Sequence, residues 1–457
     1  MVTLVNRAKV ATATTGTGTI TLGSAESGYQ SFADAGVVDT DVVRYVIENG
    51  TDWEIGTGTY SAGTLTRTVL ESSNADAALN LTGSAVVYVS AVAEDIPSLE
   101  LYAENYDGTS TKPSATGDNA VAIGSGSLAS STSAIAIGTS ASNFGSSETV
   151  VIGRSASAYL ATGSLSVGYS SAVNGSYATG VGYDVTVNNA RSSGIGYKAY
   201  TSADDSFSIG MARTSGVFGL SAQISSTSSS YGAKSTHGIA IGKNTVANGS
   251  YGVSVGSFNS QTGTGGLIVG YGNTSTGTGS VIVGYSSKAL ADYSLAAGYY
   301  SGSNEIGKYA YASGTFSAGS WGTAQQGTFV LRSDITDATP EALTTNNSAA
   351  SIDNQIILPN NSAYSFSGTI IARQQASAGS EYASWEVKGA LLRDATAATT
   401  VLGNGIKNKL FASAGASAWD IALTADTTNG GLAITVTGAA ATNIRWVATV
   451  NTSEVTY

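Results

Sequence analysis

A short phrase of the form apolar–x–apolar–Gly recurs through the middle of this chain at an almost constant interval. It reads Val-Ala-Ile-Gly at residues 121–124 and Ile-Ala-Ile-Gly at residues 239–242. Twelve glycines close the phrases: Gly124, Gly138, Gly153, Gly168, Gly182, Gly196, Gly210, Gly242, Gly256, Gly270, Gly284 and Gly298. Their spacing is 14 or 15 residues, with one interval of 32 between Gly210 and Gly242. So short a period holds two short strands and two tight turns, which predicts one coil of a β-solenoid.

The phrase also predicts how each coil is built. Alternate residues of a strand face the same way, so we expect Ile239 and Ile241 to point inward and Ala240 to point outward. Stacked coils would then form a continuous apolar interior. The closing glycine permits a sharp corner with a positive φ, and the linkers of small residues suit tight turns. Because such a core is thin, we expect the chain to form an oligomer.

The repeat carries a family resemblance. Strings such as AIAIG and VSVG every 14 residues, spaced by S-x-A-x-G-x-S, resemble the head repeat of trimeric autotransporter adhesins, the YadA-type head. The resemblance covers roughly residues 118 to 320. It implies a left-handed parallel β-roll, three copies of which pack into a homotrimer that serves as an adhesive shaft. It does not imply a bacterial owner.

The chain as a whole is expected to be all-β. Pro97 and Pro113 bracket a polar connector ahead of the repeats. In the long interval, residues 211–238 form either a degenerate coil with a serine-rich bulge or an outward loop. The predicted domains are an N-terminal β domain at 1–96, a linker at 97–117, the β-roll at 118–325 and a C-terminal β-sandwich at 326–457.

The N-terminal domain has two motifs of its own. Residues 53–60 read WEIGTGTY, and residues 65–74 read LTRTVLESSN. The pair resembles the N-terminal module of bacteriophage fibre proteins. Such modules attach a fibre to the virion, so the resemblance implies a phage tail or baseplate protein as the partner of this domain.

The C-terminal domain has alternating strands and three of the five tryptophans. Its strands are typical of a β-sandwich such as a jelly roll, and it loosely resembles a tip domain of phage fibres. Trp446 alternates with Ile444 and Ala448 and is expected in the core. Trp419 follows a run of small residues and is the best exposed candidate. The candidate receptor-binding residues, for a host surface glycan or outer-membrane protein, are Trp419, Asp420, Arg373 and Trp385, with Arg445 nearby.

The composition of the chain argues against catalytic sites, thiolate metal sites and nucleic-acid binding. The chain has no cysteine, one histidine (His237) and a net charge of −11. No thiolate metal site, catalytic residue or cofactor is predicted, and the lack of a basic patch makes nucleic acid a poor partner. Asp204 and Asp205 are neighbours on a strand and point opposite ways, so they cannot flank one glycosidic bond. The other acids considered for the repeats are Glu148, Asp184 and Asp292.

Tyrosine directly follows six of the repeat glycines. The two runs of three, each at one-coil spacing, are Tyr169, Tyr183 and Tyr197, then Tyr271, Tyr285 and Tyr299. They predict tyrosine ladders. The ladders could stack against sugars, or pack at a trimer interface or roll corner, and packing is the preferred interpretation.

These features together favour a non-enzymatic homotrimeric phage tail fibre, an extracellular component of the virion. A bacterial trimeric surface adhesin is the first alternative. Against it, we see no secretion signal, heptad stalk or amphipathic C-terminal membrane strands in the sequence. A glycan-degrading tailspike is the second alternative.

Overall fold

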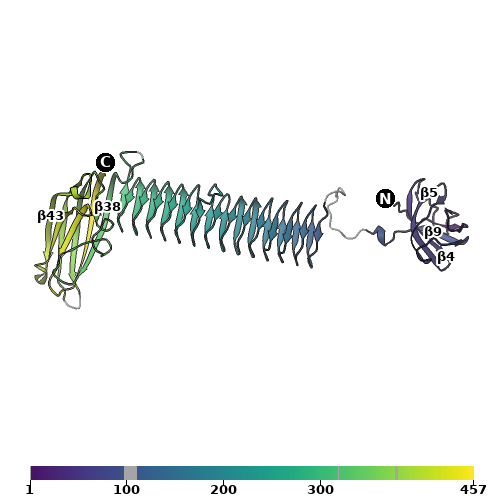
Figure 1. Ribbon diagram of the computed structural model, residues 1–457, viewed down its shortest axis with the longest axis horizontal. Coiled ribbons are helices and arrows are strands. Elements are labelled where there is room, and N and C mark those ends of the chain that lie inside the picture. Colours follow the sequence, from purple (N-terminus) through teal and green to yellow (C-terminus); the bar gives the residue numbers. More distant parts are fainter. Residues whose placement is uncertain (1, 97–110, 318, 376–378) are drawn as a thin grey trace. The chain divides into compact units, whose positions relative to one another are not determined.

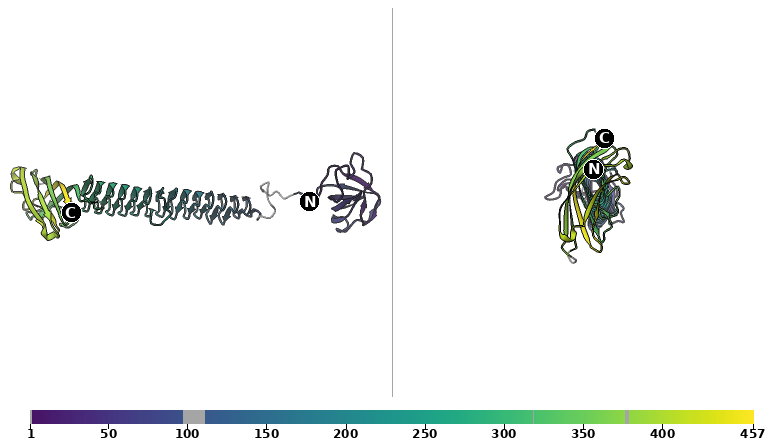
Figure 2. Two further views of the ribbon diagram at one scale, coloured as in Figure 1. Left: turned by 90° about the horizontal axis from the view of Figure 1, so that it is seen from above. Right: turned by 90° about the vertical axis from the view of Figure 1, so that its left-hand side faces the viewer.

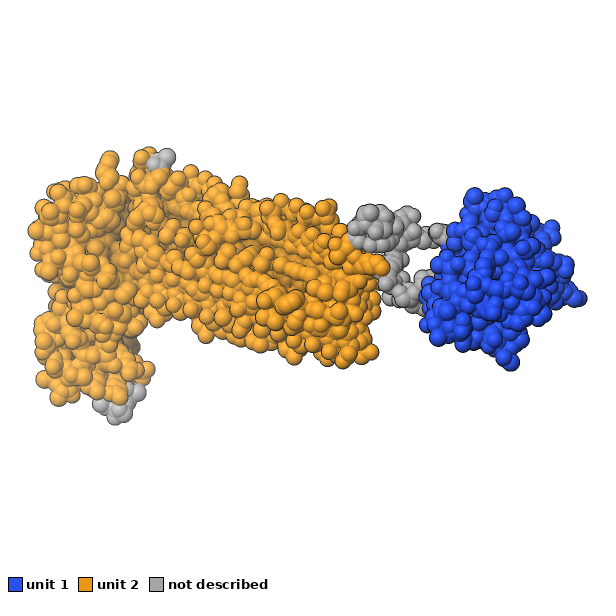
Figure 3. All heavy atoms as spheres, turned by 45° about the vertical axis from the view of Figure 1, so that its right-hand side comes forward, with its two compact units in different colours: residues 1–101 blue, residues 102–457 orange. Residues whose placement is uncertain are grey.

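The computed structural model describes residues 2–96, 111–317, 319–375 and 379–457, and most of its regular structure is β-strand (Figure 1). It divides into two compact units, residues 1–101 and 102–457 (Figure 3). Residues 97–110 of the expected linker at 97–117 lie outside the described residues. Within its remaining part, strand β10 (Ser114–Ala115) already belongs to the roll. Among the described residues, no helix has the length and apolar character needed to span a membrane.

The N-terminal unit is a twisted antiparallel sheet around its own core. Strands β4 (Val42–Asn49) and β5 (Asp52–Ser61) form a hairpin through a turn at Gly50, whose φ is +74°. Buried side chains such as Tyr45 and Ile47 fill the core. The remaining elements are β1 (Lys9–Thr12), β2 (Thr15–Gly16), β3 (Ile20–Thr21), β6 (Thr64–Leu65), β7 (Thr68–Ser72), β8 (Leu81–Thr82), β9 (Ala85–Val89) and the 3-10 helix η1 (Ala93–Asp95).

The repeats form a parallel β-roll of two sheets, with each coil giving one strand to each sheet (Figures 1 and 2). The first sheet has 14 strands in the described residues: β10, β12 (Leu128–Ala129), β14 (Ser142–Phe144), β16 (Ser157–Tyr159), β18 (Ala172–Val173), β20 (Thr186–Val187), β22 (Tyr200–Thr201), β24 (Arg213–Thr214), β26 (Gly232–Ala233), β28 (Val246–Ala247), β30 (Ser260–Gln261), β32 (Thr274–Ser275), β34 (Lys288–Ala289) and β36 (Gly302–Ser303). The roll strands of the second sheet are β11 (Val121–Ile123), β13 (Ile135–Ile137), β15 (Val150–Ile152), β17 (Leu165–Val167), β19 (Thr179–Tyr183), β21 (Ser193–Tyr197), β23 (Phe207–Ile209), β25 (Leu220–Ala222), β27 (Ile239–Ile241), β29 (Val253–Ser257), β31 (Leu267–Tyr271), β33 (Val281–Tyr285), β35 (Leu295–Tyr299) and β37 (Tyr309–Ala312). This confirms the predicted solenoid.

The register follows the sequence period. Ile239 pairs with Val253, which pairs with Leu267, one coil at a time. The long interval is also coiled, because Phe207 pairs with Leu220 and Leu220 with Ile239. The serine-rich residues 225–230 lie between β25 and β26, so the interpretation as coils with a bulge is the right one.

The predicted facing of the strand residues is wrong. Ala240 is fully buried, whereas Ile239 and Ile241 remain partly exposed, and Ser254 is likewise buried between partly exposed Val253 and Val255. The interior is narrow and is filled mainly by Ala, Ser, Thr and Gly. Its hydroxyls bond one another, as between Thr245 and Ser254 at 2.9 Å.

The C-terminal domain continues the second sheet of the roll. Strand β38 (Ala324–Ile335) pairs antiparallel with β37 and opens a sheet of order β38–β46–β41–β42–β43. A smaller sheet of β39, β40, β44 and β45 packs against it and encloses a core, giving a β-sandwich-like domain. The bounds are β39 (Glu341–Ala342), β40 (Ile356–Ile357), β41 (Ser362–Gln374), β42 (Tyr382–Arg393), η2 (Ala397–Thr399), β43 (Val401–Ala412), η3 (Ala414–Ala416), β44 (Asp420–Asp426), β45 (Gly431–Thr437) and β46 (Ile444–Thr456).

Candidate functional site

The outer face of the second roll sheet carries two columns of mainly aliphatic side chains, interrupted at positions such as Thr179, Ser193 and Ala222, which we call the aliphatic columns. They are the first and third residues of the phrases, and Val283, 53% exposed, is the most open of them. At about 4.8 Å per coil and roughly 7 Å across, fourteen coils give an apolar strip of roughly 450 Å². The members are Val121, Ile123, Ile135, Ile137, Val150, Ile152, Leu165, Val167, Val181, Ile195, Ile209, Leu220, Ile239, Ile241, Val253, Val255, Leu267, Val269, Val281, Val283 and Leu295.

The opposite sheet is different. Its outward positions include Ser157, Thr186, Arg213 and Lys288 and are mainly polar or small. A contiguous exposed apolar strip on one face alone marks that face as an interaction surface. The signal in the sequence is the large size of the first and third residues of each phrase, which strand alternation alone is equally able to place in the interior or on this outer face.

The predicted tyrosine ladders exist and lie on the outside of the single chain. Tyr169 and Tyr183 stack with ring centroids 5.1 Å apart, and Tyr271 and Tyr285 stack at 5.0 Å. Sugars stack on the face of an aromatic ring, and in a ladder each inner face is covered by the next ring. The geometry therefore favours packing over sugar stacking.

A further aromatic column was not predicted. His237 stacks between Phe218 and Tyr251, with centroids 4.9 and 4.8 Å away. All three residues lie two positions before a strand of the second sheet and have φ near +57°. His237 is thus a corner residue of its coil.

The C-terminal tryptophans are buried. Trp385 and Trp419 are each 1% exposed, and Trp446 lies between them at 5.2 and 6.1 Å. The prediction for Trp446 is confirmed, but the prediction that Trp419 is exposed is wrong. Its small neighbours, such as buried Ala416, let the chain turn tightly into the core rather than expose the ring.

The candidate receptor-binding residues do not meet in one site. Asp420 lies on β44 of the smaller sheet and pairs with Lys407 at 2.6 Å. Trp385 faces the core from β42, whereas Arg373 is exposed on β41. Arg373 lines a cleft together with Arg445.

This cleft, which we call the arginine cleft, has a volume of about 800 Å³. Arg445 donates from Nε to Asp334 Oδ2 at 3.2 Å, and Asn443 donates to Gln375 Oε1 at 2.9 Å. Its lining residues are Asp334, Thr336, Asn347, Arg373, Gln374, Gln375, Asn443 and Arg445.

A buried ionic cluster ties the last coil of the roll to the C-terminal domain. Lys308 lies 2.9 Å from Glu454 and 3.2 Å from Glu305, and Gln325 donates to Glu454 at 2.6 Å. Burial raises the pKa of Glu305, although the Lys308 charge opposes this. Burial alone would lower the pKa of Lys308, but the two carboxylates outweigh it and raise that pKa. The joint is therefore held by specific charges as well as by the shared sheet.

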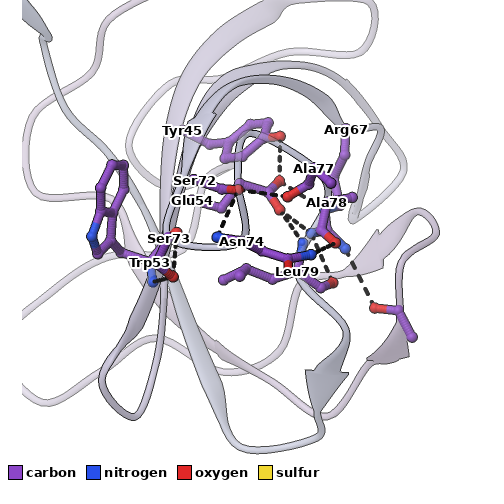
Figure 4. Close-up of polar contacts among 11 residues, drawn as sticks. Tyr45, Trp53, Glu54, Arg67, Ser72, Ser73, Asn74, Ala77, Ala78 and Leu79 are labelled. Atoms are coloured by element: carbon purple, nitrogen blue, oxygen red, sulfur yellow. Dashed lines mark hydrogen bonds and ion pairs between the residues drawn. The ribbon is translucent and has the colours of Figure 1, made fainter.

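The two N-terminal motifs meet in one buried network (Figure 4). Glu54 and Arg67 form an ion pair with almost no exposed side-chain surface. Tyr45 donates to Glu54 at 2.7 Å, and burial raises the pKa of Tyr45 well above its usual value. Glu54 also accepts from the Leu79 backbone N–H at 2.8 Å, which fixes the segment after β7. The motif residues thus hold the domain together.

Four acids of the roll, Asp184, Asp204, Asp205 and Asp292, make side-chain contacts to a neighbouring coil. Asp205 pairs with Arg191 at 2.6 Å, and Asp204 accepts from the Ala190 backbone N–H at 3.1 Å. Within the described residues, His, Asp and Glu nowhere form a group of three that could hold a metal ion.

Comparison with known proteins identifies the repeats. Residues 115–141, 233–259 and 275–301 match the family described as YadA head domain repeat (2 copies). These three stretches of the shaft are therefore similar to YadA head repeats. A search of curated proteins gave no matching sequence.

Among solved structures, the chain has a weak likeness to the tailspike protein of Acinetobacter baumannii phage AM24. The identity is 8% and the TM-score 0.17, with 77% of this chain and 65% of that chain covered. This chain therefore spans just under two thirds of that protein's length.

Proposed function

We propose that this chain forms a homotrimeric tail fibre of a bacteriophage and binds the host surface without cleaving it. The aliphatic columns carry the proposal, because an apolar strip along the whole roll needs a cover and further copies of the chain supply a matching one. A YadA-type head implies trimeric assembly and an extracellular or surface-exposed location.

We assign virion attachment and host recognition to the two terminal domains of the chain. The N-terminal domain carries the WEIGTGTY and LTRTVLESSN motifs of fibre attachment modules, and we assign it to a tail or baseplate protein. The C-terminal domain is rigidly joined to the roll through the Lys308 cluster and carries the arginine cleft, so we assign host recognition to it.

A bacterial trimeric surface adhesin is the second candidate, and the YadA head repeats favour it. The two proposals differ in what holds the N-terminal domain. Gold-labelled antibodies against residues 1–96, applied to phage particles and to bacterial cells, distinguish them by electron microscopy.

The test of the fibre proposal uses the full chain. Light scattering should give a mass of about three times 45.7 kDa. The trimer should bind host cells, compete with intact particles and leave purified host polysaccharide at its original length. A mass of 45.7 kDa or failure to compete would contradict the fibre, and shortened polysaccharide would favour a tailspike.

A further inference from the structure

The arginine cleft lies on the exposed face of the larger C-terminal sheet, in the domain that carries β38 and β43 in Figure 1. Three neighbouring strands build its floor: β38 gives Asp334, β46 gives Arg445 and β41 gives Arg373. Asn347, from the segment after β39, also lines it. A volume of about 800 Å³ is within the range of small-ligand sites.

The charges of the cleft are not balanced. Arg445 lies directly opposite Asp334 on one side and Arg373 on the other. Like charges directly opposite in an antiparallel sheet destabilise it, and one carboxylate cannot neutralise two guanidinium groups. Arg332 adds a third positive charge in a side pocket of about 230 Å³ that shares Asp334, Asn347 and Arg445. This local excess of positive charge stands out in a chain of net charge −11.

The surroundings supply hydrogen-bonding groups and an apolar patch. The contact from Asn443 to Gln375 uses one donor and one acceptor of two side-chain amides, each of which has further hydrogen-bonding capacity. Beside the arginines, Val447 and Ile371 face each other across β46 and β41 and are largely exposed. Sugars present hydroxyls on their edges and C–H groups on their faces, which match amides and a small apolar patch.

We propose that the arginine cleft binds an acidic saccharide, with its anionic group on Arg373 and Arg445 and its hydroxyls on the amides. The planar guanidinium fork suits a carboxylate or sulfate oxygen pair. The proposal rests on host recognition by the C-terminal domain and specifies the ligand of that function.

Calorimetric titration of the full-length protein tests this assignment. The probes are a tetramer of galacturonic acid, a sulfated chondroitin tetramer and neutral maltotetraose. At least one acidic probe should bind, and the neutral tetramer should bind about tenfold more weakly or not at all. The stronger acidic probe tells carboxylate from sulfate. Equal binding of all three probes, or of none up to 5 mM, would overturn the proposal.

Variants locate the site. Arg373→Ala and Arg445→Ala should each weaken binding of the acidic probe about 10- to 100-fold. Arg373→Lys should lie between them and the unaltered protein, because it keeps the charge and loses the fork. Lys388→Ala is the matched control. It removes a positive charge from β42, on the same exposed face of the larger sheet as the two arginines but outside the cleft. If Lys388→Ala weakened binding of the acidic probe as much as the arginine variants do, the effect would come from the net charge of the protein and not from the cleft.

Cell binding separates this proposal from the function on which it rests. Host cells that bind the unaltered trimer and both arginine variants alike would refute the cleft and leave the fibre intact. If the unaltered trimer does not bind host cells, the fibre proposal fails, whatever the titrations show.

Discussion

Gly270, at the end of a repeat phrase, provides a direct test of why the repeat glycines are needed. Its φ is +132°, a region that residues with a side chain rarely adopt. A Cβ at this position would overlap the carbonyl oxygen of Gly284 in the next coil and lie 2.9 Å from its carbonyl carbon. Carbon atoms in contact normally stand about 3.5–4.0 Å apart. Gly270→Ala must therefore either change the backbone dihedral angles at this corner of the coil or push the two coils apart.

The expected cost follows from these two effects. Backbone strain at such a φ is about 1–3 kcal/mol, and overpacking against backbone that cannot rotate away adds about 1–3 kcal/mol. Gly270→Ala should thus destabilise the roll by about 2–6 kcal/mol per chain. Gly265 is the matched control, because its φ is +68° and a Cβ there would meet nothing within 4 Å. Tyr251 and Tyr293 adopt the same conformation one and two coils away, so Gly265→Ala should cost about 1 kcal/mol.

Scanning calorimetry at one fixed protein concentration compares the variants. At about 2 °C per kcal/mol for a domain of this size, Gly270→Ala should lower Tm by roughly 4–12 °C and Gly265→Ala by roughly 2 °C. Equal shifts for the two variants would refute the argument that the close approach of neighbouring coils, beyond the sign of φ, requires glycine.

Three further predictions concern the joint and the roll. Glu454→Gln should lower the stability of the joint by about 3 kcal/mol, measured by calorimetry, because Glu454 is the carboxylate nearer to Lys308 and also accepts hydrogen bonds from Gln325 and Thr452. Glu305→Gln should instead raise Tm slightly at pH 7, because burial raises the pKa of Glu305 and its charged form is disfavoured in the folded state. That advantage over the unaltered protein should shrink as pH falls from 7 toward 4.5, where Glu305 takes up its proton in the folded state first. Deleting residues 256–269 should shorten the roll by one coil, about 4.8 Å in electron micrographs, and unfolding of the remaining coils would show the register to be wrong.

The sequence predicts the coil stack well because the period is imposed by backbone geometry. Every repeat glycine closes a phrase at the same corner, so spacing alone determines register. Which residues of the phrase point into the roll is harder to predict from the sequence. The side chains of a three-residue strand alternate between its two faces in either orientation. Large apolar residues are also equally suited to a core and to an interface between chains. The small middle residues, such as Ala240 and Ser254, are the signal for a narrow interior.

The C-terminal domain shows the opposite limit. Arg373 and Arg445 lie 72 residues apart in sequence and meet because β41 pairs with β46. No local pattern reveals which strands of a sandwich are neighbours. Trp419 precedes β44 and lies outside the clean alternation of a strand, so its burial depends on how the turn at η3 packs and not on periodicity.

The central claim is that copies of this chain cover the aliphatic columns. The chain has no cysteine, so single cysteines introduced as Val283→Cys and Thr274→Cys report two known positions on opposite sheets. Maleimide labelling of the native full-length protein should modify Thr274→Cys rapidly and Val283→Cys at least about tenfold more slowly, with the difference lost on unfolding. Val283→Cys labelled as fast as Thr274→Cys in the native state would contradict the account.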